Sequence, residues 1–281
     1  MLAPVIPVGG HRVGRDGRLA LRFERRHGTT VVARCRYTLP LQVLAPLTLD
    51  DTAAVVSVLN PTGGLVGGDY LTIDVTVGAG AHACVTTPSA TRVYRAAGPP
   101  AEQHVRLALD AGATLEWVPD HTIPSGGSAL RQRIEVSIGE QARLILVDAF
   151  AAGRVARGEA FCFRSLESGI VVSDARGWLV RDRFMLQGSD RWAGLGLAEG
   201  HAYFATMVVI GDELNGLEQQ LAETLRRPCE VESGVALLPR RGAIVRMLAA
   251  TAPALLATLD AVWAIARRAL LGLPPLPLRK S

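Results

Sequence analysis

The sequence is poor in lysine and in aromatic residues, and this scarcity narrows the range of functions. Lys280 is the only lysine among 30 basic residues, and aromatic residues make up 5% of the 281 positions. Nucleic-acid-binding proteins cluster their positive charge and interleave it with stacking rings, whereas the arginines here are dispersed along the chain. With a formal net charge of only +4, we expect no nucleic-acid partner.

Cysteine is also scarce, and its spacing excludes the common cysteine motifs. The four cysteines lie far apart without a Cys-x-x-Cys pair, so neither a zinc site nor a redox motif is recognisable. They are Cys35, Cys84, Cys162 and Cys229. We expect them to be reduced thiols in a cytoplasmic protein.

Long uncharged apolar runs are missing. The most apolar segment, 247–273, contains Pro253, Asp260, Arg267 and Arg268, which interrupt the roughly 20 apolar residues that a bilayer core requires. The N-terminal apolar patch has no basic region before it and is broken by prolines, so we expect no cleaved signal peptide. Both observations predict a protein without a membrane partner.

No catalytic constellation is recognisable either. The serines and the six histidines are not accompanied by a Gly-x-Ser-x-Gly elbow, and no local pair of carboxylates marks an acid and a base. Four glycines within 63–68 suggest a phosphate loop, but no lysine follows them. The segment also leads into an expected strand, where a phosphate loop needs a helix N-terminus. We therefore exclude nucleotide binding at this loop and expect no enzyme activity.

From Leu19 to Arg183, apolar and polar residues alternate in short runs that Gly, Pro or Asp interrupts, which is typical of half-buried strands. A hairpin with its turn near His27 and Gly28 begins this region. Further strands are expected in AAVVSVLNP, YLTIDVTV, AHACVTT, ATLEWVP, QRIEVSI and ARLILVD. We expect residues 19–183 to form an all-β body.

Three segments of this body share a strand-turn-strand pattern. They begin at Val75 (VTVGAGAHACVTT), Leu107 (LALDAGATLEWVP) and Val136 (VSIGEQARLILVD), at offsets of 32 and 29 residues. Their tight turns end in Ala81, Ala113 and Ala142. Repeats of this size are produced by stacked sheets or β-solenoid coils, because each coil buries its apolar face on the next. We expect a mainly β fold of β-helix or solenoid-like stacked sheets, with a sandwich of hairpins as the alternative.

After Phe204 the pattern changes to strand, helix, strand, strand and helix. We expect strands at 204–211, 230–237 and 243–248, and a helix from Asp212 to Arg227 with Asp212 as its N-cap and Pro228 as its stop. Residues 200–273 would thus form a mixed α/β portion of a single domain spanning 1–281.

The last helix has one apolar face, and Gly272 with Pro274 ends it. The face is formed by Leu255, Leu259, Val262, Trp263, Ala266 and Leu270. It either packs on the β body or binds a partner; amphipathic helices more often bury such a face within their own chain.

His82 and Cys84 are two residues apart on an expected strand and therefore share one face, to which His104 and His121 could add nitrogen ligands. The spacing is not that of a closed metal site, and a buried free cysteine usually behaves as a small hydrophobic residue. We expect no tightly bound metal here; a weak, transient site is the alternative.

The stretch from Asn60 to Arg95 carries several motifs in a characteristic order. It contains a Gly-Gly-x-x-x-Gly-Asp turn, a strand, a Gly-Ala turn, a Thr-Thr run and the ending Thr-Arg-Val-Tyr-Arg. Asp148 and a Gly-Arg…Gly-Glu-x-Phe signature over 153–161 follow. With these motifs the chain resembles the urease accessory protein family called UreD or UreH over roughly 22–183, and LGLPPLPLR resembles the family's terminal segment. The segment WVPDHTIPSGGSALRQR departs from the pattern, because family members carry a more apolar run there.

The resemblance implies a β-helical scaffold that is not an enzyme. It implies binding to a UreF-like protein, a complex with a UreG-like GTPase, docking on apo-urease, and allows a homodimer within that complex. Nickel would pass through such a complex without being held as a cofactor, because tight binding would trap the ion.

Polar residues within the motifs are the candidates for a transient nickel path. They are Asp69, Thr86, Thr87, Glu116, Asp148 and Glu159. Structural roles are the alternative: Asp69 capping the turn after Gly68, the threonines bonding backbone, and Glu159 pairing with Arg154.

Amphipathic residues that often anchor interfaces are the candidates for partner binding. They are Arg92, Tyr94, Arg95 and Trp263. For the first three, an exposed strand end is the alternative.

Two other functions are compatible with a mainly β chain: a β-helical enzyme acting on polysaccharide and a structural subunit of an oligomer. The first would need aromatic residues along a groove and a pair of carboxylates. Only four Trp and four Tyr are present, and no such pair is visible.

Overall fold

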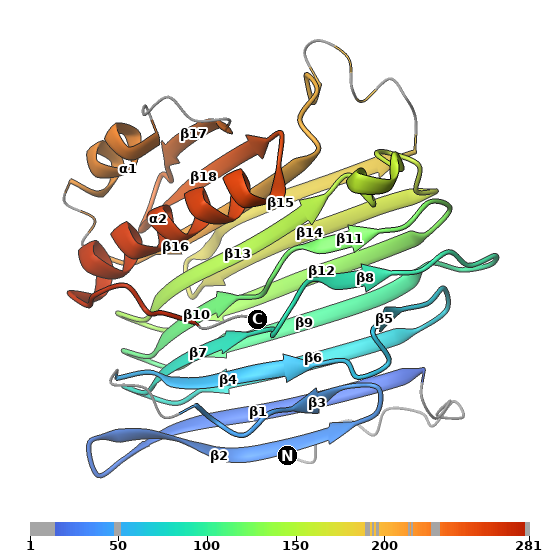
Figure 1. Cartoon of the computed structure of the whole chain (residues 1–281). Coiled ribbons are helices and arrows are strands. Elements are labelled where there is room, and N and C mark those ends of the chain that lie inside the picture. Colours follow the sequence, from blue (N-terminus) through green and yellow to red (C-terminus); the bar gives the residue numbers. More distant parts are fainter. Residues whose placement is uncertain are drawn as a thin grey trace.

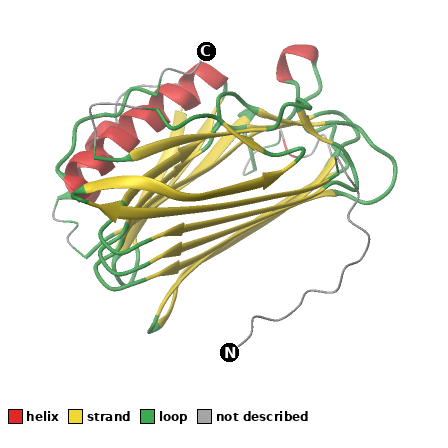
Figure 2. Cartoon of the chain, turned by 90° about the horizontal axis from the view of Figure 1, so that it is seen from below, coloured by secondary structure: helices red, strands yellow, loops and turns green. Residues whose placement is uncertain are grey.

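The computed structural model describes residues 15–47, 52–188, 192, 194, 197–212, 214, 216–225 and 231–278. Most of these residues lie in strands, which form two sheets that face each other. Helix α2 (Ala252–Leu271) lies on the outside of one sheet (Figures 1 and 2).

The first sheet has seven strands in the order β15-β14-β12-β9-β6-β1-β2. Neighbours from β1 to β14 run parallel, while β2 and β15 pair antiparallel at the two ends. The strands are β1 (Asp16–Arg26), β2 (Thr29–Thr38), β6 (Tyr70–Val77), β9 (Ala101–Leu109), β12 (Ala129–Ile138), β14 (Ser165–Asp174) and β15 (Gly177–Gln187).

The second sheet follows the order β17-β18-β16-β13-β10-β7-β4-β3. Strands β4, β7, β10 and β13 run parallel, and β16, β18 and β17 continue antiparallel. The strands are β3 (Gln42–Val43), β4 (Ala54–Leu59), β7 (His82–Thr86), β10 (Thr114–Val118), β13 (Arg143–Ala151), β16 (Tyr203–Ile210), β17 (Val231–Leu237) and β18 (Gly242–Ala249).

Short elements connect the sheets. Strands β5 (Gly64–Leu65), β8 (Thr91–Val93) and β11 (Thr122–Pro124) pair with one another along one side of the stack, and β11 also pairs with β13. The 3-10 helix η1 (Val155–Arg157) follows β13, and helix α1 (Leu217–Leu225) lies between β16 and β17.

The chain winds as a β-solenoid. Each coil passes through the first sheet, a tight turn and the second sheet, and returns one strand further along. Val75 is the register partner of Leu107, and Leu107 of Val136, so the three predicted repeats stack on one another. Their turns stack as well, because the Thr114 amide donates to the Ala81 carbonyl at 2.8 Å. A solenoid of about four turns results, which confirms the stacked-sheet prediction over the sandwich of hairpins.

Two cores stabilise this arrangement. The larger fills the space between the sheets, where alternate residues of each strand point inward, as Leu71, Ile73 and Val75 do on β6. The smaller lies between the second sheet and α2, where Leu255, Val262 and the other apolar residues of the helix face pack. The apolar face of the last helix therefore packs on the β body.

The helix predicted from Asp212 begins later. Helix α1 starts at Leu217, after Gly216 with a left-handed φ of 73°, and Asp212 forms an ion pair with Arg241, so its prediction as the N-cap is wrong. Pro228 and Cys229 lie outside the described residues.

The other local predictions near the termini hold. The first hairpin turns at His27 and Gly28, with positive φ angles of 50° and 86°. Helix α2 ends at Gly272, whose φ of 66° places it in the left-handed region. Within the described ranges, no helix combines the length and the apolarity that crossing a bilayer requires.

Candidate functional site

One register row inside the solenoid carries three polar residues after its first position. Leu71, Gln103, Gln132 and Ser168 are successive partners across β6, β9, β12 and β14, and all four point inward. The neighbouring inward rows are apolar; the next row, for example, begins with Ile73. A line of polar groups therefore crosses an otherwise apolar core.

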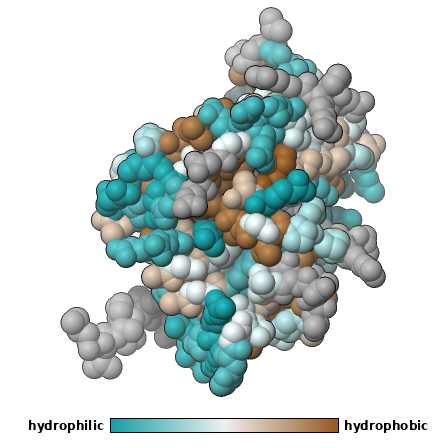
Figure 3. Space-filling view, turned by 90° about the vertical axis from the view of Figure 1, so that its left-hand side faces the viewer, coloured by the Kyte–Doolittle hydropathy of each residue, from teal (hydrophilic) through white to brown (hydrophobic). Residues whose placement is uncertain are grey.

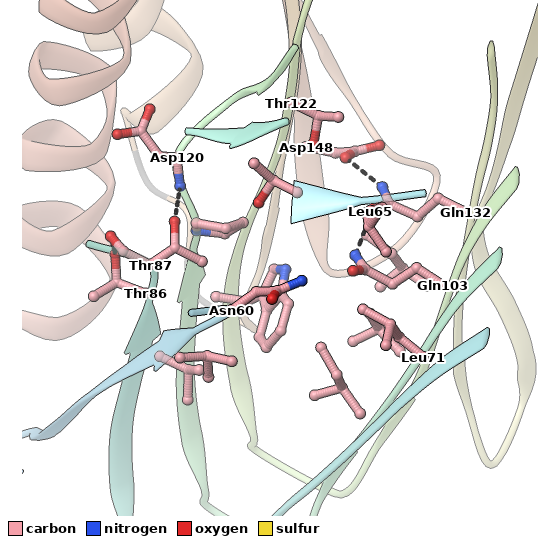
Figure 4. A pocket seen from close by; sticks show the side chains of 18 of the residues that line it. Asn60, Leu65, Leu71, Thr86, Thr87, Gln103, Asp120, Thr122, Gln132 and Asp148 are labelled. Carbon is pink, nitrogen blue, oxygen red and sulfur yellow. Dashed lines mark hydrogen bonds between the residues drawn. The ribbon is translucent and has the colours of Figure 1, made fainter. Parts of the chain in front are cut away.

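This line ends on Asp148, which reaches in from β13 of the opposite sheet (Figure 4). Gln103 Nε2 donates to Gln132 Oε1 at 2.8 Å, and Gln132 Nε2 donates to Asp148 Oδ1 at 2.7 Å. Ser168 Oγ donates to Asp148 Oδ2 at 2.7 Å. The chain of hydrogen bonds thus links the two sheets through the interior.

Asp148 is a buried carboxyl with only neutral hydrogen-bond donors. It is 8% exposed and forms no ion pair with any described residue. Burial raises its pKa from 3.8 to about 6, although the hydrogen bonds from Ser168 and Gln132 oppose this shift. The group is therefore mostly ionised at neutral pH, and no described residue supplies a bonded counter-charge.

Asp148 lines an internal cavity of about 70 Å³, enough for one or two water molecules. The labelled side chains of Figure 4 surround this cavity and come from both sheets and from the loops beside β8 and β11. Polar lining residues include Asn60, Thr86, Thr87, Thr91, Gln103, Asp120, Thr122 and Gln132. Among the described residues that line the cavity there is neither histidine nor cysteine.

A larger hollow of about 640 Å³ lies on the other side of Asp148, lined by residues of β15, β16 and β18. Its wall is rich in aromatic rings, among them Phe150, Phe184 and Phe204, and charged residues such as Asp182 and Arg246 also line it. Asp148 lines both spaces, so it marks the point where the internal cavity and the hollow adjoin.

The structure brings three of the six path candidates together at the cavity: Thr86, Thr87 and Asp148. Both threonine side chains are also hydrogen-bonded to backbone. Thr86 Oγ1 donates to the Val118 carbonyl at 2.8 Å, and Thr87 Oγ1 accepts from the Asp120 amide at 2.8 Å.

Asp69 and Glu159 lie apart from the cavity lining. Asp69 Oδ2 accepts from the Val66 amide at 2.7 Å, so the carboxylate closes the turn before β6. Glu159 pairs with Arg154, which lowers the pKa of its carboxyl, and accepts from the Gly126 amide at 3.0 Å. In this structure both hold loops together.

Glu116 points out of the solenoid and lies beneath α2. One carboxylate oxygen bonds to Arg267 and to His82 Nε2, the latter at 2.8 Å, and the other accepts from Trp263 Nε1 at 2.7 Å. Glu116 and Arg267 are both 0% exposed. The cluster ties the last helix to the second sheet.

The partner-binding candidates fall in two places. Trp263 is buried on the inner face of α2, whereas Arg92 in β8 and Arg95 just after β8 are exposed. Tyr94 donates its hydroxyl to the Gly63 carbonyl at 3.2 Å, and Arg95 Nε donates to the Gly126 carbonyl at 3.1 Å.

The candidate metal ligands do not converge. His82 and Cys84 lie beneath α2, His104 packs beside Tyr70, and His121 bonds to Asp120. Among the residues that the structure describes, no group of three or more His, Cys, Asp or Glu could hold a metal ion.

The sequence prediction missed Gln103, Gln132 and Ser168. A signal was present, because each replaces an apolar residue in the alternation of its strand; Gln132, for example, lies between the inward-facing Leu130 and Ile134. Alternation alone does not show that three such positions share one register row.

The comparisons with known proteins agree with the resemblance. The family model described as UreD urease accessory protein matches residues 15–281. The protein named urease accessory protein UreD from Alkalilimnicola ehrlichii is 37% identical over 99% of this chain and 92% of its own length. Those of the same name from Deinococcus radiodurans and Delftia acidovorans are 35% and 34% identical over 98% of this chain, covering 98% and 97% of their lengths. These names denote an accessory protein and not an enzyme. The chain belongs to the UreD family of urease accessory proteins.

Proposed function

We propose that the chain assists nickel insertion into apo-urease in the cytoplasm, and that Ni²⁺ moves through the solenoid interior past Asp148. The observation that carries the proposal is the position of Asp148. It is a buried carboxylate without an ionic partner among the described residues, located where the internal cavity and the larger hollow adjoin.

The donor groups along the line suit transport better than storage. Amide, hydroxyl and carboxylate oxygens bind a divalent cation less firmly than a cage of imidazoles or thiolates does. The described part of the cavity lining supplies oxygens from Gln103, Gln132 and Asp148, and neither histidine nor cysteine. An ion could be stabilised there and still leave.

Protons compete with a cation for Asp148. Because its pKa is about 6, the carboxylate is mostly free of protons at pH 7 and mostly protonated at pH 5. Nickel transfer by this route should therefore decline as the pH falls through 6.

We propose a UreF-like protein, a UreG-like GTPase and apo-urease as the partners, with a homodimer as one form of the complex. Arg92 and Arg95 are exposed and available for contact. Figure 3 also shows apolar side chains gathered in one area and surrounded by hydrophilic ones, a pattern found at protein contacts.

The test is Asp148→Asn, co-expressed with urease and the partner proteins. We expect several-fold less nickel per purified urease, because the substitution removes the charge and keeps the shape. Co-purification of the partners should be unchanged. Metal analysis of urease and pull-down of the complex measure the two quantities.

Asp74→Asn is the matched control, because Asp74 lies on the outer face of the first sheet and pairs with Arg106. Asp69→Ala and Glu159→Ala test two of the three acidic candidates outside the cavity; the third, Glu116, is paired with Arg267 beneath α2. Normal nickel content with Asp148→Asn, in an intact complex, would exclude the proposed path.

A further inference from the structure

A third hollow lies away from the proposed path, beside β8, β11 and η1. Its volume is about 350 Å³, and it shares no lining residue with the internal cavity or the aromatic hollow. Its polar lining consists of Arg92, Arg154, Arg157, Tyr94, Tyr203 and Ser125, with no aspartate or glutamate among the described residues that line it.

The hollow carries excess positive charge. Arg154 is neutralised by Glu159, with Nε 2.8 Å from Oε2, but Arg92 and Arg157 form no ion pair with a described residue. Two guanidinium charges therefore remain without a bonded carboxylate at a concave surface. Guanidinium groups present paired N–H donors that match the oxygens of phosphate and carboxylate groups.

Ser125 gives a second, independent indication of a ligand. As a whole residue it is only 5% exposed, and it lines the hollow; its hydroxyl makes no hydrogen bond with a described residue and is not enclosed by the protein. Its backbone amide is already used, donating to the Val93 carbonyl at 2.8 Å. Polar groups of buried residues are normally hydrogen-bonded, so the unbonded hydroxyl of Ser125 in the wall of a positively charged hollow fits an acceptor that arrives with a ligand.

Close backbone approach fixes the shape of the hollow. A Cβ at Gly153 would lie 2.0 Å from the Glu159 carbonyl oxygen, and the φ of Gly153 is 150°. Glycine at position 153 thus lets the backbone before η1 approach the backbone at Glu159. Arg154 and Arg157, which lie between these two positions, both line the hollow. The basic wall is therefore built into the fold.

We propose that this hollow is an oxyanion-binding pocket for a small phosphate-bearing ligand. A phosphate monoester carries about two negative charges at neutral pH, which equals the charge that Arg92 and Arg157 leave unpaired. The volume lies within the range of about 300–1,000 Å³ typical of small-molecule sites and exceeds what a phosphate group alone fills. Tyr94, Tyr203 and the apolar lining contact the rest of the ligand.

The experiment titrates the purified full chain, with its co-purified partners if they are needed, with inorganic phosphate and with pyrophosphate. Calorimetry gives the dissociation constant, and the shift in melting temperature gives a second readout. We expect saturable binding that is tighter for pyrophosphate than for phosphate. The single variants Arg92→Gln and Arg157→Gln should each weaken this binding about tenfold. Ser125→Ala should weaken it less.

Arg36→Gln is the matched control, because Arg36 is exposed on β2 and makes no ion pair with a described residue. Its affinity should equal that of the parent chain. Absence of saturable binding for both anions, or binding unchanged in Arg92→Gln and Arg157→Gln, would overturn the proposal. A triglutamate peptide provides a further test. If it binds more tightly than pyrophosphate, and if Arg92→Gln and Arg157→Gln abolish its binding, the pocket holds an acidic protein segment and the proposal is overturned.

Discussion

The second sheet buries one carboxylate on each of its faces, and the two differ in their partners. Glu116 faces outward beneath α2, where Arg267 supplies a full positive charge and Trp263 an additional N–H donor. Asp148 faces inward, where its donors are the neutral amide of Gln132 and the hydroxyl of Ser168. Both carboxylates are buried, so desolvation disfavours the charge of each.

The comparison teaches that the partner, and not the burial, decides what a buried acid can do. A carboxylate bonded to a buried guanidinium is neutralised within the chain and fixes one arrangement of helix and sheet. A carboxylate with neutral donors keeps an unbalanced charge, so a proton or a cation can supply the balance. Three substitutions test this distinction.

The largest effect is expected for Glu116→Gln. It removes the charge that balances Arg267, and breaking a buried ion pair of this kind costs about 3–5 kcal/mol of unfolding free energy. Urea denaturation at pH 7 measures the loss. The proposed nickel delivery should decline only in proportion to the folded fraction, because Glu116 is not among the described residues of the cavity lining.

Two further variants sharpen this result. Asp74→Asn, which breaks the exposed pair with Arg106, should cost less than about 1 kcal/mol. The double change Glu116→Leu with Arg267→Leu should recover much of the stability lost in Glu116→Gln, because no buried charge is left unpaired. A small effect of Glu116→Gln would mean that the cluster does not hold α2.

Asp148→Asn should act in the opposite direction. The folded chain holds the Asp148 proton more tightly than the unfolded chain, because the pKa is about 6 when folded and 3.8 ordinarily. The stability of the parent chain should therefore fall by up to about 3 kcal/mol as the pH rises from about 4 to about 6. The asparagine variant lacks this loss and should be the more stable protein at pH 7.

Urea denaturation of both proteins at several pH values between 4 and 7 measures this difference. We expect the asparagine variant to have the larger free energy of unfolding, and we expect its difference from the parent chain to increase as the pH rises. A gap that stays constant over this range would show that Asp148 has an ordinary pKa, and the contrast with Glu116 would disappear.

Among the substitutions at the two buried acids and their hydrogen-bond donors, the smallest effect is expected for Ser168→Ala. The hydroxyl donates to the ionised carboxylate, so its loss should raise the pKa of Asp148 further and cost about 1–2 kcal/mol at pH 7. The cost should be smaller at pH 5, where Asp148 is mostly protonated. Equal losses at both pH values would indicate a packing effect instead.

The fold could be predicted from the sequence because its signals are local. Alternation identified the strands, and the alanine-ending turns at 81, 113 and 142 revealed the repeat that stacks. The start of α1 was misjudged because Asp212 resembles an N-cap, while its carboxylate is taken by the distant Arg241.

The candidate site was only partly predictable. Thr86, Thr87 and Asp148 belong to motifs and line the cavity, but Gln103, Gln132 and Ser168 become neighbours only through the register of separate coils. The structural use of Glu116 was equally hidden, because its partner Arg267 is 151 residues away. Contacts between residues of different coils depend on how the solenoid winds, so the spacing of residues along the sequence does not reveal them.

The parallel register of the first sheet also sets a length scale. Adjacent strands lie about 4.8 Å apart, so Gln103, Gln132 and Ser168 present their oxygens at steps of that size along the stack. An ion moving along them would pass between neighbouring donors without a long gap. Inserting one coil would add one strand spacing to this line of oxygens. A one-residue slip of β12 would instead turn Gln132 to the solvent, so that Gln103 and Ser168 would be separated by two strand spacings without a donor between them.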